Sequence, residues 1–320
     1  MPLLESLKDK PSCGKPTKSV LAAPNMVTVA RLMFIEKNLS KFTRNISEVG
    51  KEKFKTVFGD TKPLIAMIHT AASPGAPMNA LSPVEIVAHA LNEAEVYASE
   101  GVDALMIENM HDVPYVKRQA GPEVVALMTR IAAEIKRRFA LPLGIQILAG
   151  ANREALAAAL VSGADFIRAE GFVFGHLADE GYMESDAAEL LRYRKYIGAE
   201  HIAVFADIKK KHASHAITAD VDLAQTAHAA AFFLADGVIV TGSSTGQAAR
   251  PGDVEAAGTA GLPVLVGSGI TDANLPDFYP LADGFIVGSF FKRGGHWAND
   301  LDRERIRGLV TLKKTLDANA

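Results

Sequence analysis

The sequence of 320 residues has a single cysteine, Cys13, and this scarcity excludes two kinds of architecture. An intramolecular disulfide and a zinc site built on thiolates both need more cysteines than one. The chain also lacks any apolar run near the ~18 to 20 residues that cross a bilayer as a helix. We therefore expect a globular protein without a transmembrane segment, in the cytoplasm or in an organellar matrix such as that of mitochondria.

Most of the chain lacks an excess of positive charge. The first 62 residues carry 12 Lys and Arg against 6 Asp and Glu, whereas the remaining 258 carry 22 against 31. A nucleic-acid-binding surface needs a basic patch, so no nucleic-acid partner is expected. The chain also lacks the Gly-Lys-Ser/Thr sequence of a Walker loop, which argues against ATP hydrolysis.

The first 60 residues differ from the rest in pattern. Residues 1–25 contain several prolines and no hydrophobic periodicity, so we expect them to be poorly ordered. Residues 26–43 are amphipathic and basic, which fits either an organellar transit segment or a helix packed across the bottom of the following domain. We expect residues 1–60 to be an extension, partly disordered or transit-like, and residues 61–320 to be one domain.

From residue 61 onward a short apolar run followed by a helical pattern recurs eight times. Such alternation indicates parallel strands with right-handed crossovers, and eight units close a barrel, whereas a doubly wound open sheet usually has five or six strands. The expected fold is therefore α/β, a single (β/α)8 TIM barrel. The expected strands are 63–70, 103–109, 142–150, 166–171, 202–210, 237–242, 263–269 and 284–290, and the expected helices are 83–100, 122–139, 153–161, 187–197, 222–234, 251–259, 273–281 and 303–316.

Polar residues gather where the expected strands end, which is where barrels of this kind carry their chemistry. Period-two alternation places Arg168 and Glu170 on one face of a strand, and likewise Asp207 and Lys209. One hypothesis is a catalytic bowl in which Asp207 and Lys209 act as an acid/base pair; the other is a set of ion pairs that closes the barrel top. The candidate catalytic residues are Asp207, Lys209, Glu108, Glu170 and Arg168, and the neighbouring candidates for ligand binding are His69, Asn109, Gln146 and Thr241.

Small residues follow the sixth, seventh and eighth expected strands. Glycine lets backbone N–H groups approach an anion, so the last two of these turns predict a phosphate site, although tight turns alone would also explain them. After the sixth strand, Thr241 and Gly242 begin a run of small residues to 246 that we expect to cover the ligand as a mobile loop. The candidate phosphate-binding residues are Gly267, Ser268, Gly269, Gly288 and Ser289.

No organic cofactor is expected, and a divalent metal is left open. Carboxylates suit Mg²⁺ or Mn²⁺, and such an ion would be held by His69, Glu108, Glu170 and Asp207.

Several segments together resemble the BtpA family, over nearly all of residues 54–316. They are Ile-Ala-Met-Ile-His-Thr at 65–70, Ala-Leu-Met-Ile-Glu-Asn at 104–109, Phe-Ile-Arg at 166–168, Glu-Leu-Leu-Arg-Tyr-Arg at 189–194, Ala-Asp-Ile-Lys-Lys-Lys-His-Ala at 206–213 and Val-Leu-Val-Gly-Ser-Gly-Ile-Thr at 264–271. The resemblance implies a barrel of the ribulose-phosphate-binding type. It also brings the family's label, a factor for biogenesis of photosystem I, although members occur in animals and in sugar-utilisation operons of enteric bacteria.

The chain departs from the family's bacterial pattern at two places. Many bacterial members have Asn-Val-Leu-Arg-Asn-Asp on the third strand, where this chain has Gln-Ile-Leu-Ala-Gly-Ala-Asn, and Glu170 stands where the usual residue is Asn. These departures and the long leader resemble a eukaryotic branch of the family.

Two functions compete. The first is an enzyme, a lyase, an isomerase or a glycosyl-bond-cleaving enzyme, acting on a small phosphorylated sugar or nucleoside-like ligand. The second is a non-enzymatic biogenesis or assembly factor for a membrane protein complex, which uses the barrel as a binding platform. Whether the chain forms a homo-oligomer is left open.

Overall fold

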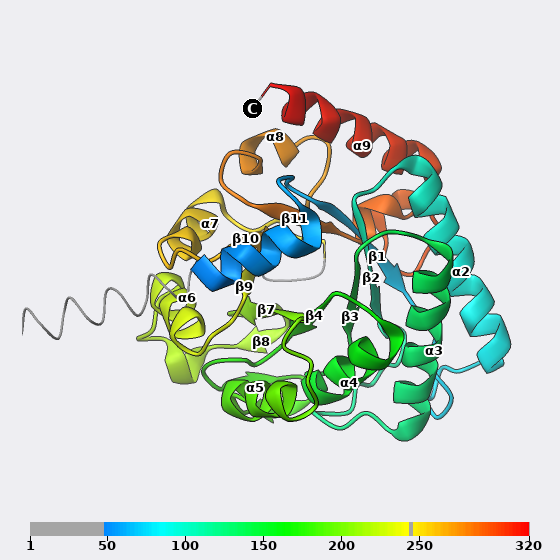
Figure 1. Cartoon of the computed structure of the whole chain (residues 1–320), viewed down its shortest axis with the longest axis horizontal. Coiled ribbons are helices and arrows are strands. Elements are labelled where there is room, and N and C mark those ends of the chain that lie inside the picture. Colours follow the sequence, from blue (N-terminus) through cyan, green and yellow to red (C-terminus); the bar gives the residue numbers. More distant parts are fainter. Residues whose placement is uncertain (1–47, 243–245, 320) are drawn as a thin grey trace, which may run out of the picture. The chain divides into compact units, whose positions relative to one another are not determined.

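The computed structural model describes residues 48–242 and 246–319, and the segment 26–43 lies outside them. Eight parallel strands close a barrel in the order β1-β11-β10-β9-β7-β4-β3-β2 (Figure 1). The expected barrel and its eight strands are therefore confirmed. The strands are β1 (Leu64–His69), β2 (Ala104–Glu108), β3 (Leu143–Gln146), β4 (Phe166–Ala169), β7 (Ala203–Ile208), β9 (Gly237–Val240), β10 (Val264–Val266) and β11 (Gly284–Val287).

Helices cover the outside of the ring of strands, as Figure 1 shows. Two begin with complete capping boxes, in which the side chains of Ser82 and Glu85, and of Asp222 and Gln225, satisfy each other's backbone N–H groups. None of the described helices is long and apolar enough to cross a membrane. The helices are α2 (Pro83–Glu100), α3 (Pro122–Arg138), α4 (Asn152–Ser162), α5 (Ala187–Tyr196), α6 (Leu223–Phe232), α7 (Pro251–Gly258), α8 (Leu275–Phe278) and α9 (Arg303–Ala318).

A helix over residues 48–58 closes the amino-terminal end of the barrel, and we call this end the floor. Its Phe58 ring lies 5.4 Å from Phe166 and 6.0 Å from Phe205, at the starts of β4 and β7. Phe54 lies 5.9 Å from Phe205. In Figure 1 this helix, in blue, crosses the middle of the ring of strands. By its contacts the helix shares one core with the floor, although the sequence assigned residues 1–60 to the extension.

Four aspartates clip neighbouring strands together at the floor. Each lies just before a strand, and its carboxylate accepts a hydrogen bond of 2.8 Å from an N–H at the start of the preceding barrel strand, at Leu64, Leu143, Val204 or Val264. In return, the backbone N–H of each aspartate donates to the carbonyl of the strand residue whose N–H its carboxylate accepts. These paired bonds fix the register of β2 on β1, β4 on β3, β9 on β7 and β11 on β10. The four are Asp103, Asp165, Asp236 and Asp283.

A small antiparallel sheet, which the sequence did not predict, stands beyond the carboxyl ends of β4 and β7. It consists of β5 (His176–Ala178), β6 (Gly181–Met183) and β8 (Ala213–Ser214), in the order β6-β5-β8. Three short 3-10 helices complete the described chain: η1 (Ala216–Thr218), η2 (Ser289–Phe291) and η3 (Arg293–Gly295).

Candidate functional site

A ring of eight residues, one from each barrel strand or the residue just beyond it, lines the carboxyl end of the barrel, which we call the mouth. The apolar interior ends at residues such as Met67, Met106, Phe205 and Ile239. Two positions further along each strand the side chains point the same way, and there the interior becomes polar. The ring is His69, Glu108, Gln146, Arg168, Asp207, Thr241, Gly267 and Gly288, all of them candidates from the sequence.

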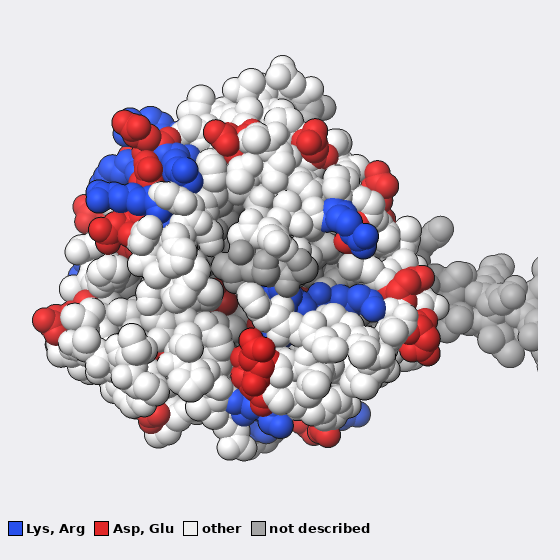
Figure 2. Space-filling view, turned by 180° about the vertical axis from the view of Figure 1, so that it is seen from behind, with Lys and Arg blue, Asp and Glu red and all other residues white. Residues whose placement is uncertain are grey.

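A cavity of about 370 Å³ opens at this mouth. In Figure 2, which views the molecule from the side opposite to Figure 1, acidic and basic atoms lie close to the centre of the face. Eight of the residues predicted from the sequence line this cavity, and Lys211, Thr271 and Arg305 line it as well. The candidates that line it are His69, Glu108, Arg168, Gly267, Ser268, Gly269, Gly288 and Ser289.

Arg168 and Asp207 form a buried, two-pronged ion pair across β4 and β7. Arg168 Nε and Nη2 lie 2.8 and 3.1 Å from the two carboxylate oxygens, and both residues are 4% exposed. Although burial opposes the charge of the guanidinium, Asp207 raises the pKa of Arg168. Arg168 is thus a fixed cation on the cavity wall, and Asp207 holds it in place.

Lys209 does not join Asp207, contrary to the alternation expected from the sequence. β7 ends at Ile208, and Lys209 takes a left-handed backbone conformation with φ of 46°. Its ammonium group lies 3.4 Å from the Thr218 carbonyl, and it does not line the cavity at the mouth. Among the described residues the ion-pair partner of Asp207 is thus Arg168 and not Lys209, and the acid/base role of Asp207 and Lys209 stays a prediction.

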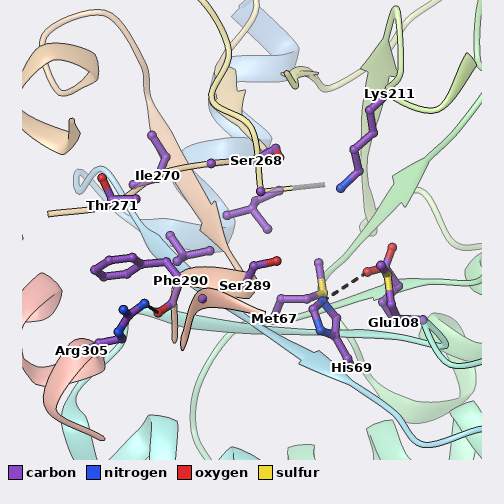
Figure 3. A pocket seen from close by; sticks show the side chains of 18 of the residues that line it. Met67, His69, Glu108, Lys211, Ser268, Ile270, Thr271, Ser289, Phe290 and Arg305 are labelled. Carbon is purple, nitrogen blue, oxygen red and sulfur yellow. Dashed lines mark hydrogen bonds and ion pairs between the residues drawn. The ribbon is translucent and has the colours of Figure 1, made fainter. Parts of the chain in front are cut away.

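His69 presents a neutral imidazole to the cavity. Its Nδ1 lies 3.2 Å from the Trp297 carbonyl, and because a carbonyl only accepts, Nδ1 carries the proton. Burial, followed by the charge of Lys292, lowers the pKa of His69 to about 3. Nε2 is then free to accept a proton, and it lies 3.7 Å from the Glu108 carboxyl. Figure 3 shows this pair at one side of the cavity.

Glu108 is the ring's candidate acid. Burial raises the pKa of its carboxyl, while Arg168 and Lys211 oppose that rise. Among the described residues it has no Lys or Arg within 4.0 Å, in contrast to Asp207. A buried carboxyl of this kind retains its proton at higher pH than usual and can donate it.

The glycine positions hollow out the other side of the ring. A methyl group at Gly288 would lie 3.1 Å from the His69 imidazole, and one at Gly267 would lie 2.5 Å from Ile239. Within the described residues, the backbone N–H groups of Ser268, Gly269, Ser289 and Phe290 have no acceptor. The buried Ser268 hydroxyl likewise has no partner there. Unpaired donors around an opening are what an anion would need.

Five other candidates do not line this cavity. Asn109 accepts from Leu148 N–H at 2.7 Å and donates to Asp112 at 2.8 Å, so it holds loops together. Glu170 pairs with Lys210 at 3.3 Å. The buried oxygens Oε1 of Gln146 and Oγ1 of Thr241 have no partner among the described residues. Gly242 borders a separate cavity, and residues 243–245 of the expected covering loop lie outside the description.

The expected metal ligands do not converge. Asp207 is engaged by Arg168, and Glu170 by Lys210. Across residues 48–242 and 246–319, no three His, Cys, Asp or Glu side chains stand close enough together to hold an ion.

A second cluster, which sequence reasoning missed, supports the loop after β4. Arg118 donates to the carbonyls of Gly150 and Gly171 and to the Asp186 carboxylate, at 3.0, 2.9 and 2.6 Å. Asn152 bonds the Glu170 backbone on both sides, at 2.8 and 3.2 Å. Burial raises the pKa of Asp186 to about 6, although Arg118 opposes the rise. A lone arginine in a loop carries no sequence signal for this role.

Comparison with known proteins identifies the relatives of the chain. A model of the BtpA family matches residues 60–315. An uncharacterized mitochondrial protein of Caenorhabditis elegans is 49% identical over 267 residues, 81% of this chain and 96% of that one. The photosystem I biogenesis protein BtpA of Synechocystis is 33% identical over 255 residues, 79% and 88% of the two chains.

Among solved structures, the Rubisco-like protein from Rhodopseudomonas palustris matches with a TM-score of 0.53 and 15% identity. The match covers 83% of this chain and 68% of that one. At this identity the likeness is one of fold alone.

Proposed function

The chain belongs to the BtpA family, and on that premise we propose that it is an enzyme acting on a small phosphorylated sugar or nucleoside-like compound. The observation that carries the proposal is one cavity with two unlike sides. One side holds His69, Glu108 and Arg168, and the other holds glycine turns whose backbone donors have no acceptor among the described residues. A ligand that has a phosphate at one end and a reactive carbon at the other would fill both.

The phosphate would bind at the turns after β10 and β11. The N–H groups of Ser268, Gly269, Ser289 and Phe290 and the Ser268 hydroxyl supply the donors, and Arg305 from α9 adds a positive charge. The missing side chains of Gly267 and Gly288 leave the room. Such loops commonly hold phosphate in barrels of this fold.

Proton transfer would take place on the opposite side. His69 Nε2 would accept a proton, the Glu108 carboxyl would donate one, and Arg168 would stabilise negative charge that develops on oxygen. Lyase, isomerase and glycosyl-bond reactions can each use a base, an acid and a stabilising cation. Water exclusion by the buried walls would strengthen each interaction.

The test uses inorganic phosphate, because it does not depend on the substrate. Phosphate should raise the melting temperature of the protein, and at ~100 Kd it should add about 2.7 kcal/mol to the free energy of unfolding. Ser289→Asp places a carboxylate at the site and should abolish the shift. Ser185→Asp, at an exposed position away from the cavity, is the matched control and should keep it. No shift in the wild type at tens of millimolar phosphate would contradict the proposal.

A second candidate is a non-enzymatic biogenesis factor, supported by the name of the Synechocystis relative. A binding platform has no use for unpaired donors inside a barrel mouth. It therefore predicts that phosphate leaves the melting temperature unchanged, and that outcome would make it the better candidate.

The proposed compartment is the mitochondrial matrix. Support comes from the name of the C. elegans relative and from the 12 Lys and Arg among the first 62 residues. Residues 1–62 fused to a fluorescent protein should accumulate in mitochondria of animal cells, whereas diffuse cytoplasmic fluorescence would contradict this assignment.

A further inference from the structure

Three consecutive lysines follow β7, and each meets a different environment. The ammonium group of Lys209 lies near the Thr218 carbonyl, outside the cavity at the mouth. Lys210 is buried and forms an ion pair with Glu170 at 3.3 Å. Lys211 alone of the three lines that cavity, and within the described chain no carboxylate pairs with its amine. In Figure 3 the amine points into the cavity from the side of Glu108, facing Ser268 and Ser289.

Burial at the cavity wall favours a neutral amine at Lys211. Burial, followed by the neighbouring cation Arg168, lowers the pKa of Lys211. Glu108, Asp207 and Glu170 oppose this lowering. Asp207 and Glu170 each already hold another cation, at 2.8 and 3.3 Å, and burial raises the pKa of the Glu108 carboxyl itself. A lysine that loses its proton more easily than usual becomes a nucleophile toward carbonyl carbon.

We propose that Lys211 forms an imine with the carbonyl carbon of an open-chain phosphorylated sugar whose phosphate occupies the turns after β10 and β11. This deepens the proposed function and rests on it. The cavity of about 370 Å³ has room for a short aldose or ketose phosphate. Because an iminium withdraws electrons from the adjacent bonds, the reaction class narrows to carbon–carbon lysis or isomerisation.

The step balances with groups already in the cavity. The Nζ lone pair of the neutral amine attacks the carbonyl carbon, and one amine proton passes to the oxygen to give a carbinolamine. The Glu108 carboxyl then donates a second proton to that oxygen, the carbon–oxygen bond breaks and water leaves. Nζ ends double-bonded to carbon with one hydrogen and one positive charge, and Glu108 ends as a carboxylate. His69 Nε2 remains available to take a proton from the carbon next to the iminium.

Pyridoxal 5′-phosphate tests the inference, because it joins an aldehyde to a phosphate in one small molecule. The full chain is incubated with it, reduced with borohydride and mapped by mass spectrometry. We expect Lys211 to be labelled faster than any other lysine, and to be labelled more slowly by pyridoxal, which lacks the phosphate. Inorganic phosphate should protect Lys211. The midpoint of the labelling rate against pH should fall below that of Lys314, an exposed lysine on α9.

The variants separate this inference from the proposed function. Lys211→Met and Lys211→Arg should both remove the label; the arginine keeps the charge and serves if the methionine variant fails to fold. Lys314→Met should leave labelling at Lys211 unchanged. If phosphate raises the melting temperature but Lys211 stays unlabelled, or label spreads evenly over exposed lysines, the inference is overturned and the proposed function stands. If phosphate has no effect either, both fall.

Discussion

At the scale of single residues, the two members of the Arg168–Asp207 ion pair have different roles: Arg168 faces the cavity, and Asp207 holds it in place. Burying two charges is costly, and their mutual attraction offsets that cost only when the geometry is good. Here the two hydrogen bonds of 2.8 and 3.1 Å provide it. The arginine remains able to face the cavity because its partner lies beside it on β7.

Removing one partner should be worse than removing both. Arg168→Met leaves a buried carboxylate unpaired, and Asp207→Leu leaves a buried cation, so each should lower the free energy of unfolding by about 3–5 kcal/mol. The double variant should lose clearly less than the sum. Urea denaturation of the four proteins measures this coupling. Additive losses would mean that the two side chains do not act as a unit.

The neutral His69 predicts a pH dependence of stability. Its folded pKa of about 3 lies below the usual 6.5, so between these values the unfolded chain binds more protons than the native one. The His69 contribution is therefore fully present above pH 6.5 and is lost as pH falls toward 3.

His69→Asn keeps an N–H near the Trp297 carbonyl but cannot titrate. We expect the wild type to lose more stability than this variant between pH 7 and pH 4, measured by urea denaturation at each pH. Nitrogen chemical shifts of His69 should show Nδ1 protonated from pH 5 to 8. Titration of the ring in that range would contradict the lowered pKa of His69, and protonation at Nε2 instead of Nδ1 would show that the assigned tautomer is wrong.

At the scale of secondary structure elements, the four aspartate clips differ in their surroundings. Asp236 is 3% exposed and also accepts from Arg194 and Lys53, at 2.6 and 3.1 Å. Asp283 is exposed and accepts from the Val264 N–H. Both aspartates thus make the same hydrogen bond to a neighbouring strand, but only Asp236 is also buried and ion-paired.

Asp236→Ala should therefore cost far more than Asp283→Ala. Asp236→Ala leaves two cations and a buried N–H without their partner and should lower the free energy of unfolding by about 3–5 kcal/mol. Asp283→Ala removes one hydrogen bond and should lower it by about 0.5–1.5 kcal/mol. Asp236→Asn, which keeps an acceptor without the charge, should fall between them. Thermal and urea denaturation measure the stability of the three variants. Equal losses in the Asp236 and Asp283 variants would show that the hydrogen bond to the neighbouring strand, and not the ion pairs of Asp236, makes the main contribution to stability.

The floor helix gives a prediction about truncation. Deleting residues 1–50 should leave the far-ultraviolet circular dichroism and a cooperative melt nearly unchanged, because Phe54 and Phe58 stay on the floor. Deleting residues 1–58 removes both rings and exposes Phe166 and Phe205, so we expect loss of soluble, cooperatively folding protein. Equal behaviour of the two truncations would contradict this role for the helix.

Physics explains which elements could be predicted. Apolar runs ending in polar residues identified all eight barrel strands, and alternation along them correctly placed Arg168 and Asp207 inside the mouth. Alternation failed at Lys209, because it holds only while the strand lasts, and a lysine gives no warning of a positive φ. The strands β5, β6 and β8 have two or three residues, too few to show a period. For the helix over 48–58 a signal existed, since Phe54 and Phe58 are spaced four apart and Gly59 follows with φ of 71°.

At the scale of the whole barrel, the packed floor and the open mouth lie at opposite ends of the strands. Sites this far apart that share no partners usually change stability independently. We expect Phe58→Ala to lower the free energy of unfolding by about 3–5 kcal/mol and with it the melting temperature. The rise in melting temperature that phosphate causes should remain. Ser289→Asp should do the reverse, with a near-normal melting temperature and no shift. A loss of the phosphate shift in Phe58→Ala would show that the two ends are coupled.

The position of the helix over residues 48–58 also decides how the protein can be attached to a solid support. Because this helix closes the floor, the described chain begins on the side away from the mouth. A biotin or affinity tag placed before residue 48 would tether the barrel by its closed end and leave the cavity facing the liquid. Libraries of sugar phosphates could then flow over a sensor chip, and the protein could be screened for ligands before any reaction is known.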